Sequence, residues 1–280
     1  TKDQIRECSI EIYPKITQKL KAIAGKAGST INIVAETAVG IMLQRYSGSN
    51  DVVFGKVVSG RNADIPGIED MVGLFINTIP LRVEAGKDET IIGLLKKQQK
   101  KSIESTNYDY YSLAEIQNMT IQGAELIKVL YVFENYDSGL KNDALANTGI
   151  TVESSREKTN YGITISGFED EGKLCFTILY DPNKYCKDEV ELILERLLKI
   201  CEEMADKPDS KVSEIVTVTE AEKQLILNDF NATETEYPRD KTVVELFEEQ
   251  VKETPDNIAL VFEDKELTYA GLNAKANSLA

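Results

Sequence analysis

A small polar cluster inside an apolar stretch is the first feature that could take part in chemistry. The run from Val72 to Val83 reads VGLFINTIPLRV and carries Gly73, Asn77 and Thr78 among aliphatic residues. An amide and a hydroxyl can hydrogen-bond to a bound molecule, and a glycine lets the backbone approach such a molecule closely. The same two side chains could instead hydrogen-bond to neighbouring backbone. The sequence leaves both interpretations open.

The chain offers no ordinary acid–base catalyst, because its 280 residues include no histidine. Histidine is the commonest general acid–base near neutral pH, so these residues alone cannot form a Ser-His-Asp triad or a histidine-dependent acyltransferase centre. Four cysteines are present, at positions 8, 175, 186 and 201, and none forms a C-x-x-C pair. They predict free thiols in a reducing compartment, and no metal site is expected. The acidic stretch at 169–172 is more typical of a hairpin turn than of a calcium loop.

Charge and hydropathy exclude several classes of function. The net charge of −15 and the isoelectric point of about 4.7 disfavour nucleic-acid binding, which needs clustered Lys and Arg. No apolar run is long enough to span a membrane, and the first residues lack the pattern of a signal peptide. We therefore expect a cytoplasmic protein without nucleic-acid or membrane partners. The absence of an initiator methionine favours a chain that is part of a larger protein.

The elements that must position the polar cluster alternate between strands and helices, which predicts an α/β (α+β) fold with a mixed sheet flanked by helices. Strands are predicted at 5–13, 52–58, 74–84, 126–133, 149–154, 161–168 and 173–180. Long helices are predicted from Pro14, from the cap at Ser29 or Thr30, over 90–105 and over 187–204. Leu74, Phe75 and Ile79 are expected in the core.

The pattern changes after residue 204. Residues 205–241 are rich in charge and are interpreted as a linker that packs against its neighbours, with one short helix that begins at the capping box of Thr219 and Glu222. A second box, Thr242 with Glu245, predicts another helix, which is followed by a hairpin over 258–269 and a final helix. A hairpin between two helices has little core, so this tail is expected to be the beginning of a larger domain.

Several motifs resemble the condensation domain of nonribosomal peptide synthetases, in its C-terminal half. They are Val52–Gly55, Val58–Arg61, Val72–Thr78 with Leu81-Arg82, Val132–Tyr136, and Glu157–Tyr161. Asn107–Leu113 sits where the family has a further motif, from which Tyr108 and Tyr111 depart. The tail is similar to the linker and start of an adenylation domain at Tyr237–Val243, Thr254–Asp256 and Leu267–Tyr269, with Gly271 where the family usually has Glu.

The resemblance implies a division into a C-terminal condensation lobe (1–205), a condensation–adenylation linker (206–241) and an N-terminal fragment of an adenylation domain (242–280). The lobe would have a chloramphenicol-acetyltransferase-like fold. The complete domain is an acyltransferase of peptide antibiotic biosynthesis that forms an amide bond between aminoacyl or peptidyl thioesters on carrier proteins. Its histidine motif lies in the other lobe, so this chain alone is expected to be inactive. A non-catalytic carrier-protein docking or scaffold module, and a heterocyclisation relative, remain alternatives.

The resemblance also suggests which residues border the substrate tunnel. They are Ser59, Arg61, Gly73, Asn77, Thr78, Asn135, Tyr161 and Gly162. No catalytic residue is expected in the chain. Phosphopantetheine would be carried by the partner carrier proteins, whereas ATP and Mg would bind only to the complete adenylation domain. Further expected partners are the N-terminal condensation lobe and the rest of the adenylation domain, and an exposed lobe interface is expected to favour self-association.

Overall fold

The structure is a computed structural model that describes residues 5–61, 65–134 and 159–279. Their contacts divide the chain into two units, Thr1–Lys223 and Gln224–Ala280, and each is described by itself. Within the described residues, no helix has both the length and the apolar character needed to cross a membrane.

The first unit is built on a six-stranded mixed sheet with the order β1-β6-β5-β4-β2-β3. Strand β4 runs parallel to β2 and β5, and the other neighbours are antiparallel. The expected mixed α/β class is therefore confirmed. The strands are β1 (Arg6–Glu11), β2 (Asp51–Val58), β3 (Asn77–Glu84), β4 (Val129–Glu134), β5 (Ile163–Asp170) and β6 (Lys173–Tyr180).

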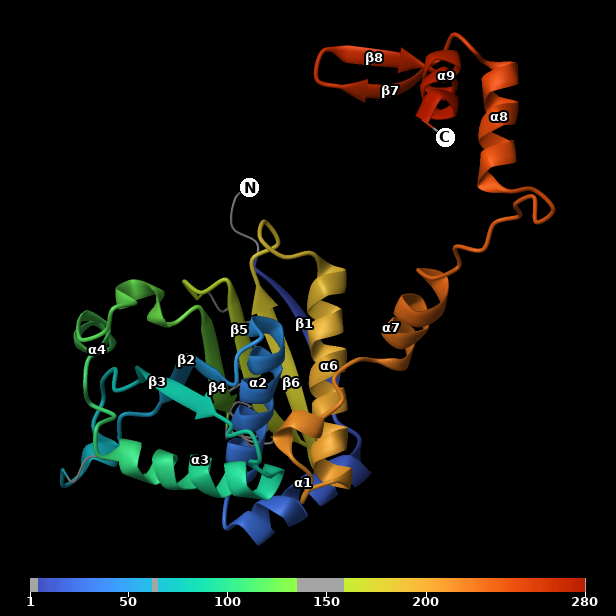
Figure 1. Cartoon of the computed structure of the whole chain (residues 1–280). Helices are drawn as coiled ribbons and strands as arrows, with labels where there is room; N and C mark the ends of the chain where they lie inside the picture. Colours follow the sequence, from blue (N-terminus) through green and yellow to red (C-terminus); the bar gives the residue numbers. More distant parts are fainter. Residues whose placement is uncertain (1–4, 62–64, 135–158, 280) are drawn as a thin grey trace, which may run out of the picture. The chain divides into compact units, whose positions relative to one another are not determined.

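Helices α1 (Pro14–Ala27), α2 (Ile31–Ser47) and α6 (Lys187–Asp206) cover one face of this sheet (Figure 1). The predicted cap of α2 is confirmed, because the Thr30 side chain accepts a hydrogen bond from the Ile33 amide. Gly48 ends that helix in the left-handed region at φ 65°. The sequence of the helix predicted over 187–204 places six apolar residues in one stripe, of which Val190, Leu194, Leu197, Cys201 and Met204 are buried and Ile193 is partly buried.

Helix α3 (Ile91–Thr106) protects the sheet edge at β3. The Lys97 side-chain amine donates to the Glu84 carbonyl oxygen over 2.9 Å, and the Gln98 side-chain amide donates to the Arg82 carbonyl oxygen over 3.3 Å. The Lys101 amine reaches the same Arg82 oxygen at 3.4 Å. Because unpaired edge carbonyls are templates for strand addition, these side chains reduce the risk of edge-to-edge aggregation.

The strand predicted over 74–84 was too long at its start, since β3 begins at Asn77, opposite Val58 of β2. Leu74 was wrongly expected in the core and is 90% exposed, because it precedes the last paired row of the sheet. Ile79 is buried as expected, and Phe75 is half-buried. The strand predicted over 149–154 lies outside the described residues. Short helices η1 (Ile68–Asp70), α4 (Leu113–Asn118) and η2 (Gly123–Leu126) had no prediction.

The first residues that follow α6 pack on the sheet unit, as interpreted for the linker, whereas residues 224–241 of the predicted linker are exposed. The Ile91 amide donates to the Ser210 carbonyl oxygen at 3.1 Å, and the Val212 amide donates to the Glu89 carbonyl oxygen at 2.9 Å. The Val212 side chain is buried, within the short helix η3 (Val212–Glu214). The short helix α7 (Glu220–Gln224) begins at the predicted capping box.

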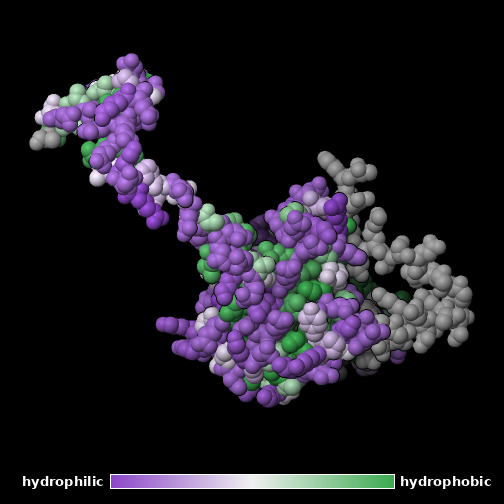
Figure 2. Space-filling model, turned by 90° about the vertical axis from the view of Figure 1, so that its right-hand side faces the viewer, coloured by the Kyte–Doolittle hydropathy of each residue, from purple (hydrophilic) through white to green (hydrophobic). Residues whose placement is uncertain are grey.

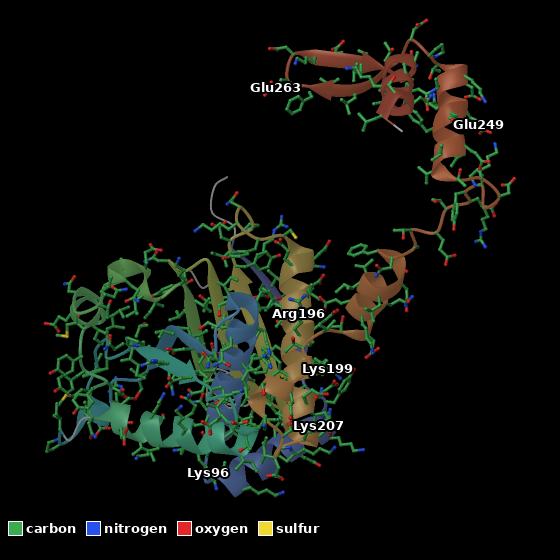
Figure 3. All side chains as sticks on the ribbon, viewed as in Figure 1. Lys96, Arg196, Lys199, Lys207, Glu249 and Glu263 are labelled. Atoms are coloured by element: carbon green, nitrogen blue, oxygen red, sulfur yellow. The ribbon has the colours of Figure 1, made fainter. Side chains whose placement is uncertain are left out.

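The second unit has the elements predicted for the tail, which are α8 (Val243–Glu253), β7 (Ile258–Phe262), β8 (Lys265–Thr268) and α9 (Tyr269–Leu279). They are preceded by η4 (Leu225–Asp229), which had no prediction. The capping box that begins α8 is present, and Glu263 stands at the hairpin turn with φ 55° (Figure 3). None of the described residues 224–279 is buried, which confirms that this unit has little core of its own.

Candidate functional site

A groove of about 460 Å³ opens where β2 and β4 end. These two strands are parallel, so their carboxyl ends lie at the same edge of the sheet. The groove brings three predicted residues together, Ser59, Arg61 and Gly73. Its other lining residues are mostly apolar: Val57, Val58, Leu74, Phe75, Ile76, Val132, Phe133 and Glu134.

Arg61 fastens the loop that forms one side of the groove. Its guanidinium donates to the carbonyl oxygens of Ile68, at 2.5 Å, and Met71, at 3.0 Å. The same group lies over the Phe75 ring, 4.4 Å from the centroid. These contacts shape the groove wall, because they fix where residues 68–75 run.

Gly60 makes this close packing possible, although it was not among the residues predicted to border the tunnel. Its φ is +67°, and a Cβ atom there would lie 1.9 Å from the Phe75 carbonyl oxygen. The neighbouring Ser59 hydroxyl accepts a hydrogen bond from the Arg61 amide at 3.3 Å. The residues Gly60 and Arg61, which the sequence indicates as the end of the strand, therefore begin a tightly packed loop.

Asn77 ties neighbouring backbone together, which is the second of the two interpretations that the sequence left open. Its side-chain amide nitrogen donates to the backbone carbonyl oxygens of Asp109, at 2.8 Å, and Tyr111, at 2.7 Å. Thr78 pairs with Val57 in the sheet. Neither Asn77 nor Thr78 is among the residues that line the groove.

Tyr161 and Gly162 lie at the other end of the sheet. They directly precede β5, whose first residue Ile163 pairs with Val129, the first residue of β4. The groove is at the last residues of β4, so the structure separates these two predicted residues from Ser59, Arg61 and Gly73. Burial raises the pKa of the Tyr161 hydroxyl. Asn135, the remaining predicted residue, lies outside the described residues.

A second, more apolar cavity of about 360 Å³ lies between α2, α6 and the sheet. Arg196 of α6 lines it and is bonded to Glu222, so the rim is held by an ion pair (Figure 3). The guanidinium also lies 5.1 Å from the centroid of the Tyr46 ring. Hydrogen bonding from Arg196 lowers the pKa of Glu222, whereas burial raises the pKa of Tyr46.

An exposed apolar surface adjoins the groove. We define it by Val72, Leu74, Ile76, Tyr108 and Tyr110, all of which are at least 60% exposed. The two hydrogen bonds of Asn77 hold the tyrosine-bearing turn beside the start of β3. By contrast, the face seen in Figure 2 is mainly hydrophilic and has only small, separate hydrophobic areas. Apolar side chains that gather in this way are typical of an interaction surface.

One ionisable pair is buried between α2 and β2. A Glu36 carboxylate oxygen lies 2.6 Å from the Lys56 amine, and the two side chains are 0% and 12% exposed. Burial raises the pKa of Glu36, and the charge of Lys56 opposes this shift. Neither residue lines the two cavities described above. Sequence reasoning missed this pair, although a carboxylate among the apolar residues of α2 was the available signal.

Comparison with known proteins places these features in a family. The family model described as the condensation domain matches residues 2–227. Bacitracin synthase 3 of Bacillus licheniformis is 38% identical over 279 residues, which cover 98% of this chain and 4% of that protein. Gramicidin S synthase 2 of Brevibacillus brevis is 39% identical over 270 residues, 95% of this chain and 6% of that protein. The chain thus spans only a small part of these relatives.

Solved structures share the fold at low sequence identity. The first condensation domain of the CDA synthetase superposes with a TM-score of 0.61 and 17% identity, over 77% of this chain and 48% of that chain. A four-domain nonribosomal peptide synthetase bound to AMP and glycine gives a TM-score of 0.75 and 16% identity, over 96% of this chain and 22% of that chain. The six-stranded sheet and its helices therefore match the expected type of condensation lobe.

Proposed function

Because this chain belongs to the condensation-domain family, we propose that it supplies the C-terminal lobe of a domain that joins two carrier-bound thioesters by an amide bond. Residues 1–205 would form the lobe, 206–241 the linker, and 242–280 the start of an adenylation domain. The overlap with about half of a solved condensation domain supports the assignment to one lobe. The relatives that match nearly the whole chain, beyond residue 227, support the continuation into a following domain.

The observation that carries this proposal is the groove beside the exposed apolar surface. Leu74 is 90% exposed, lines the groove and belongs to that surface, so the two features are continuous. A second lobe that covers this surface would bury the apolar side chains and convert the open groove into a tunnel. Burial of such side chains contributes about 25 cal/mol for each Å² removed from water.

The chemistry of the groove favours a wall without the catalytic base. Amide formation from a thioester requires a positioned amine and a group that can move its proton. The chain has no histidine, the Arg61 guanidinium is bonded to backbone carbonyl oxygens, and Glu134 is the other ionisable residue of the lining. Because the family's histidine motif belongs to the other lobe, we assign proton transfer to that lobe and expect this chain alone to be inactive.

The proposal also defines the partners. Condensation domains act on substrates that phosphopantetheine holds on carrier proteins, so carrier proteins are the proposed partners of the complete domain. ATP and Mg would bind only to a complete adenylation domain. Among the residues that the structure describes, no cluster of side chains could hold a metal ion.

The test uses this chain, the N-terminal condensation lobe of the same synthetase, and two carrier domains loaded with aminoacyl phosphopantetheine. Mass spectrometry would follow formation of the dipeptidyl carrier. We expect no product above background from either lobe alone and product from the mixture. Turnover by this chain alone would refute the assignment of proton transfer to the other lobe. A stable complex of the two lobes that never turns over would support the scaffold alternative instead.

The exposed apolar surface gives a second check. The isolated chain should self-associate as its concentration rises, and Leu74→Ser with Val72→Ser should reduce this in light scattering. Ile226→Ser, at a 49% exposed residue of the second unit, is the matched control and should have a smaller effect. A chain that stays monomeric at high concentration would contradict the interface role of this surface.

A further inference from the structure

The six-stranded sheet contains one short junction, between β2 and β4. Only two rows pair there, Gly55 with Leu130 and Lys56 with Tyr131. By comparison, β4 and β5 pair over six rows, and β2 and β3 over eight. The junction therefore divides the sheet into the pair β2–β3 and the larger group of β1, β6, β5 and β4.

The groove opens directly beyond this junction. Residues 57–61 supply one wall and residues 132–134 supply another, and both segments follow the last paired row, while residues 73–76 complete the lining. Because no ladder of paired rows continues past Lys56 and Tyr131, the distance between the two walls depends on how firmly that row is held.

Helix α2 contacts both strands at this row. The Glu36 carboxylate lies 2.6 Å from the Lys56 amine of β2, and the Tyr131 hydroxyl of β4 donates to the Asn32 side-chain oxygen at 3.2 Å. Asn32 and Glu36 are about one helical turn apart, so they project from the same side of α2. One rigid helix thus holds two adjacent strands at the row where their pairing ends.

The burial of these groups indicates a geometric role more than a stabilising one. Glu36 and Tyr131 are fully buried, and Lys56 is nearly so. A buried ion pair gives little net stability, because removal of both charges from water offsets most of their attraction. Its partners must nevertheless keep one arrangement, since either charge left alone in the interior is strongly unfavourable.

We propose that Asn32, Glu36, Lys56 and Tyr131 form a clamp across the β2–β4 junction that sets the width of the groove. The four are positioning residues that act through the strands on the groove walls. The consequence for catalysis rests on the proposed function of the groove, whereas the clamp itself is a property of this chain.

The test is amide hydrogen exchange on the whole chain, which does not depend on amide-forming activity. The double variant Glu36→Gln with Lys56→Met removes both charges, and Tyr131→Phe removes the second contact. We expect protection to fall on the order of tenfold in segments 55–58 and 130–133, with little change in β5 and β6, because loss of one hydrogen bond is worth roughly a factor of ten.

Two further variants separate positioning from general stability. Lys56→Arg keeps the charge and should preserve protection at the junction. Gln44→Leu removes another buried polar group of α2, whose amide donates to the Asn50 and Val83 carbonyl oxygens, away from the junction. It should leave segments 55–58 and 130–133 unchanged relative to the rest of the sheet.

Two outcomes would overturn the clamp. In the first, the clamp variants lose protection equally over all strands, which would reduce the network to a contribution to global stability. In the second, protection at the junction stays as in the unmodified chain. Neither outcome bears on the proposed amide-forming function, which the reconstitution with carrier domains tests separately.

Discussion

Replacement of Asn77 tests whether the polar cluster in the VGLFINTIPLRV stretch acts on the protein's own backbone. In Asn77→Ala, the carbonyl oxygens of Asp109 and Tyr111 lose hydrogen bonds of 2.8 and 2.7 Å. A hydrogen bond of this kind contributes about 1 kcal/mol net, so the turn should lose about 2 kcal/mol. This corresponds to a roughly 30-fold rise in local opening, since about 1.4 kcal/mol is a factor of ten.

The effect should centre on the turn that carries these two carbonyl groups. Asp109 of this turn is buried, whereas helix α4, which follows it, contains no buried residue. Hydrogen exchange of residues 107–118 is the assay, with denaturant unfolding to show that the sheet is unaffected. Asn107→Ala is the control, because that amide makes only an exposed contact of 3.5 Å with Glu104. The control should change stability by less than about 0.5 kcal/mol.

Asn77→Asp makes the test sharper. An ionised carboxylate has the same shape but cannot donate, and it would face two carbonyl oxygens. The loss should exceed that of Asn77→Ala at neutral pH. It should shrink as the pH falls and the carboxyl becomes protonated, because the protonated form can donate again. If the Ala variant keeps its protection, or Asp is tolerated better than Ala at neutral pH, then the amide does not hold this turn.

Two further predictions concern the helices. In Gly40→Ala, the new Cβ atom would lie 2.6–2.8 Å from atoms of the Val83 side chain. Because overpacking costs about 1–3 kcal/mol, this variant should lower the free energy of unfolding in urea by about 1 kcal/mol or more. The matched Gly25→Ala has nothing within 4 Å and should gain up to about 1 kcal/mol from helix propensity; equal effects of the two variants would contradict the packing argument. Burial raises the pKa of the Cys201 thiol to about 12. An alkylating reagent at pH 8 should therefore modify the exposed Cys186 long before Cys201. If mass spectrometry finds the reverse order of modification, Cys201 is not buried as described.

Periodicity and capping predicted most of the fold because these signals act over a few residues. The cap at Thr30, the stripe of α6 and the hairpin between β5 and β6 all depend on neighbours near in sequence. The start of β3 was predicted too early for the opposite reason. Its true start is set by the end of β2 opposite Asn77, a partner that local hydropathy does not report.

The site was predictable only in part. The resemblance of two motifs, Val58–Arg61 and Val72–Thr78, to the family suggested Ser59, Arg61 and Gly73 as residues beside the substrate tunnel. The structure brings these three residues to one groove. The two carbonyl partners of Asn77 lie more than 30 residues away in the chain, so no local pattern could identify them. The buried pair of Glu36 and Lys56 was equally hidden, since its contact exists only once α2 packs on β2.

Three polar residues in or near the groove, Ser59, Arg61 and Asn77, share a feature that affects how mutations there should be interpreted. Arg61 bonds to loop carbonyls, Asn77 bonds to the turn at 109–111, and Ser59 accepts from a backbone amide. Each therefore shapes backbone, and its replacement would displace the groove walls. A displacement of the walls by about 1 Å is enough to lower activity. Loss of activity on mutation would then report altered geometry and would not by itself identify a catalytic group. A catalytic assignment in the complete domain would need a variant that lowers kcat while hydrogen exchange at segments 55–58, 107–118 and 130–133 stays unchanged.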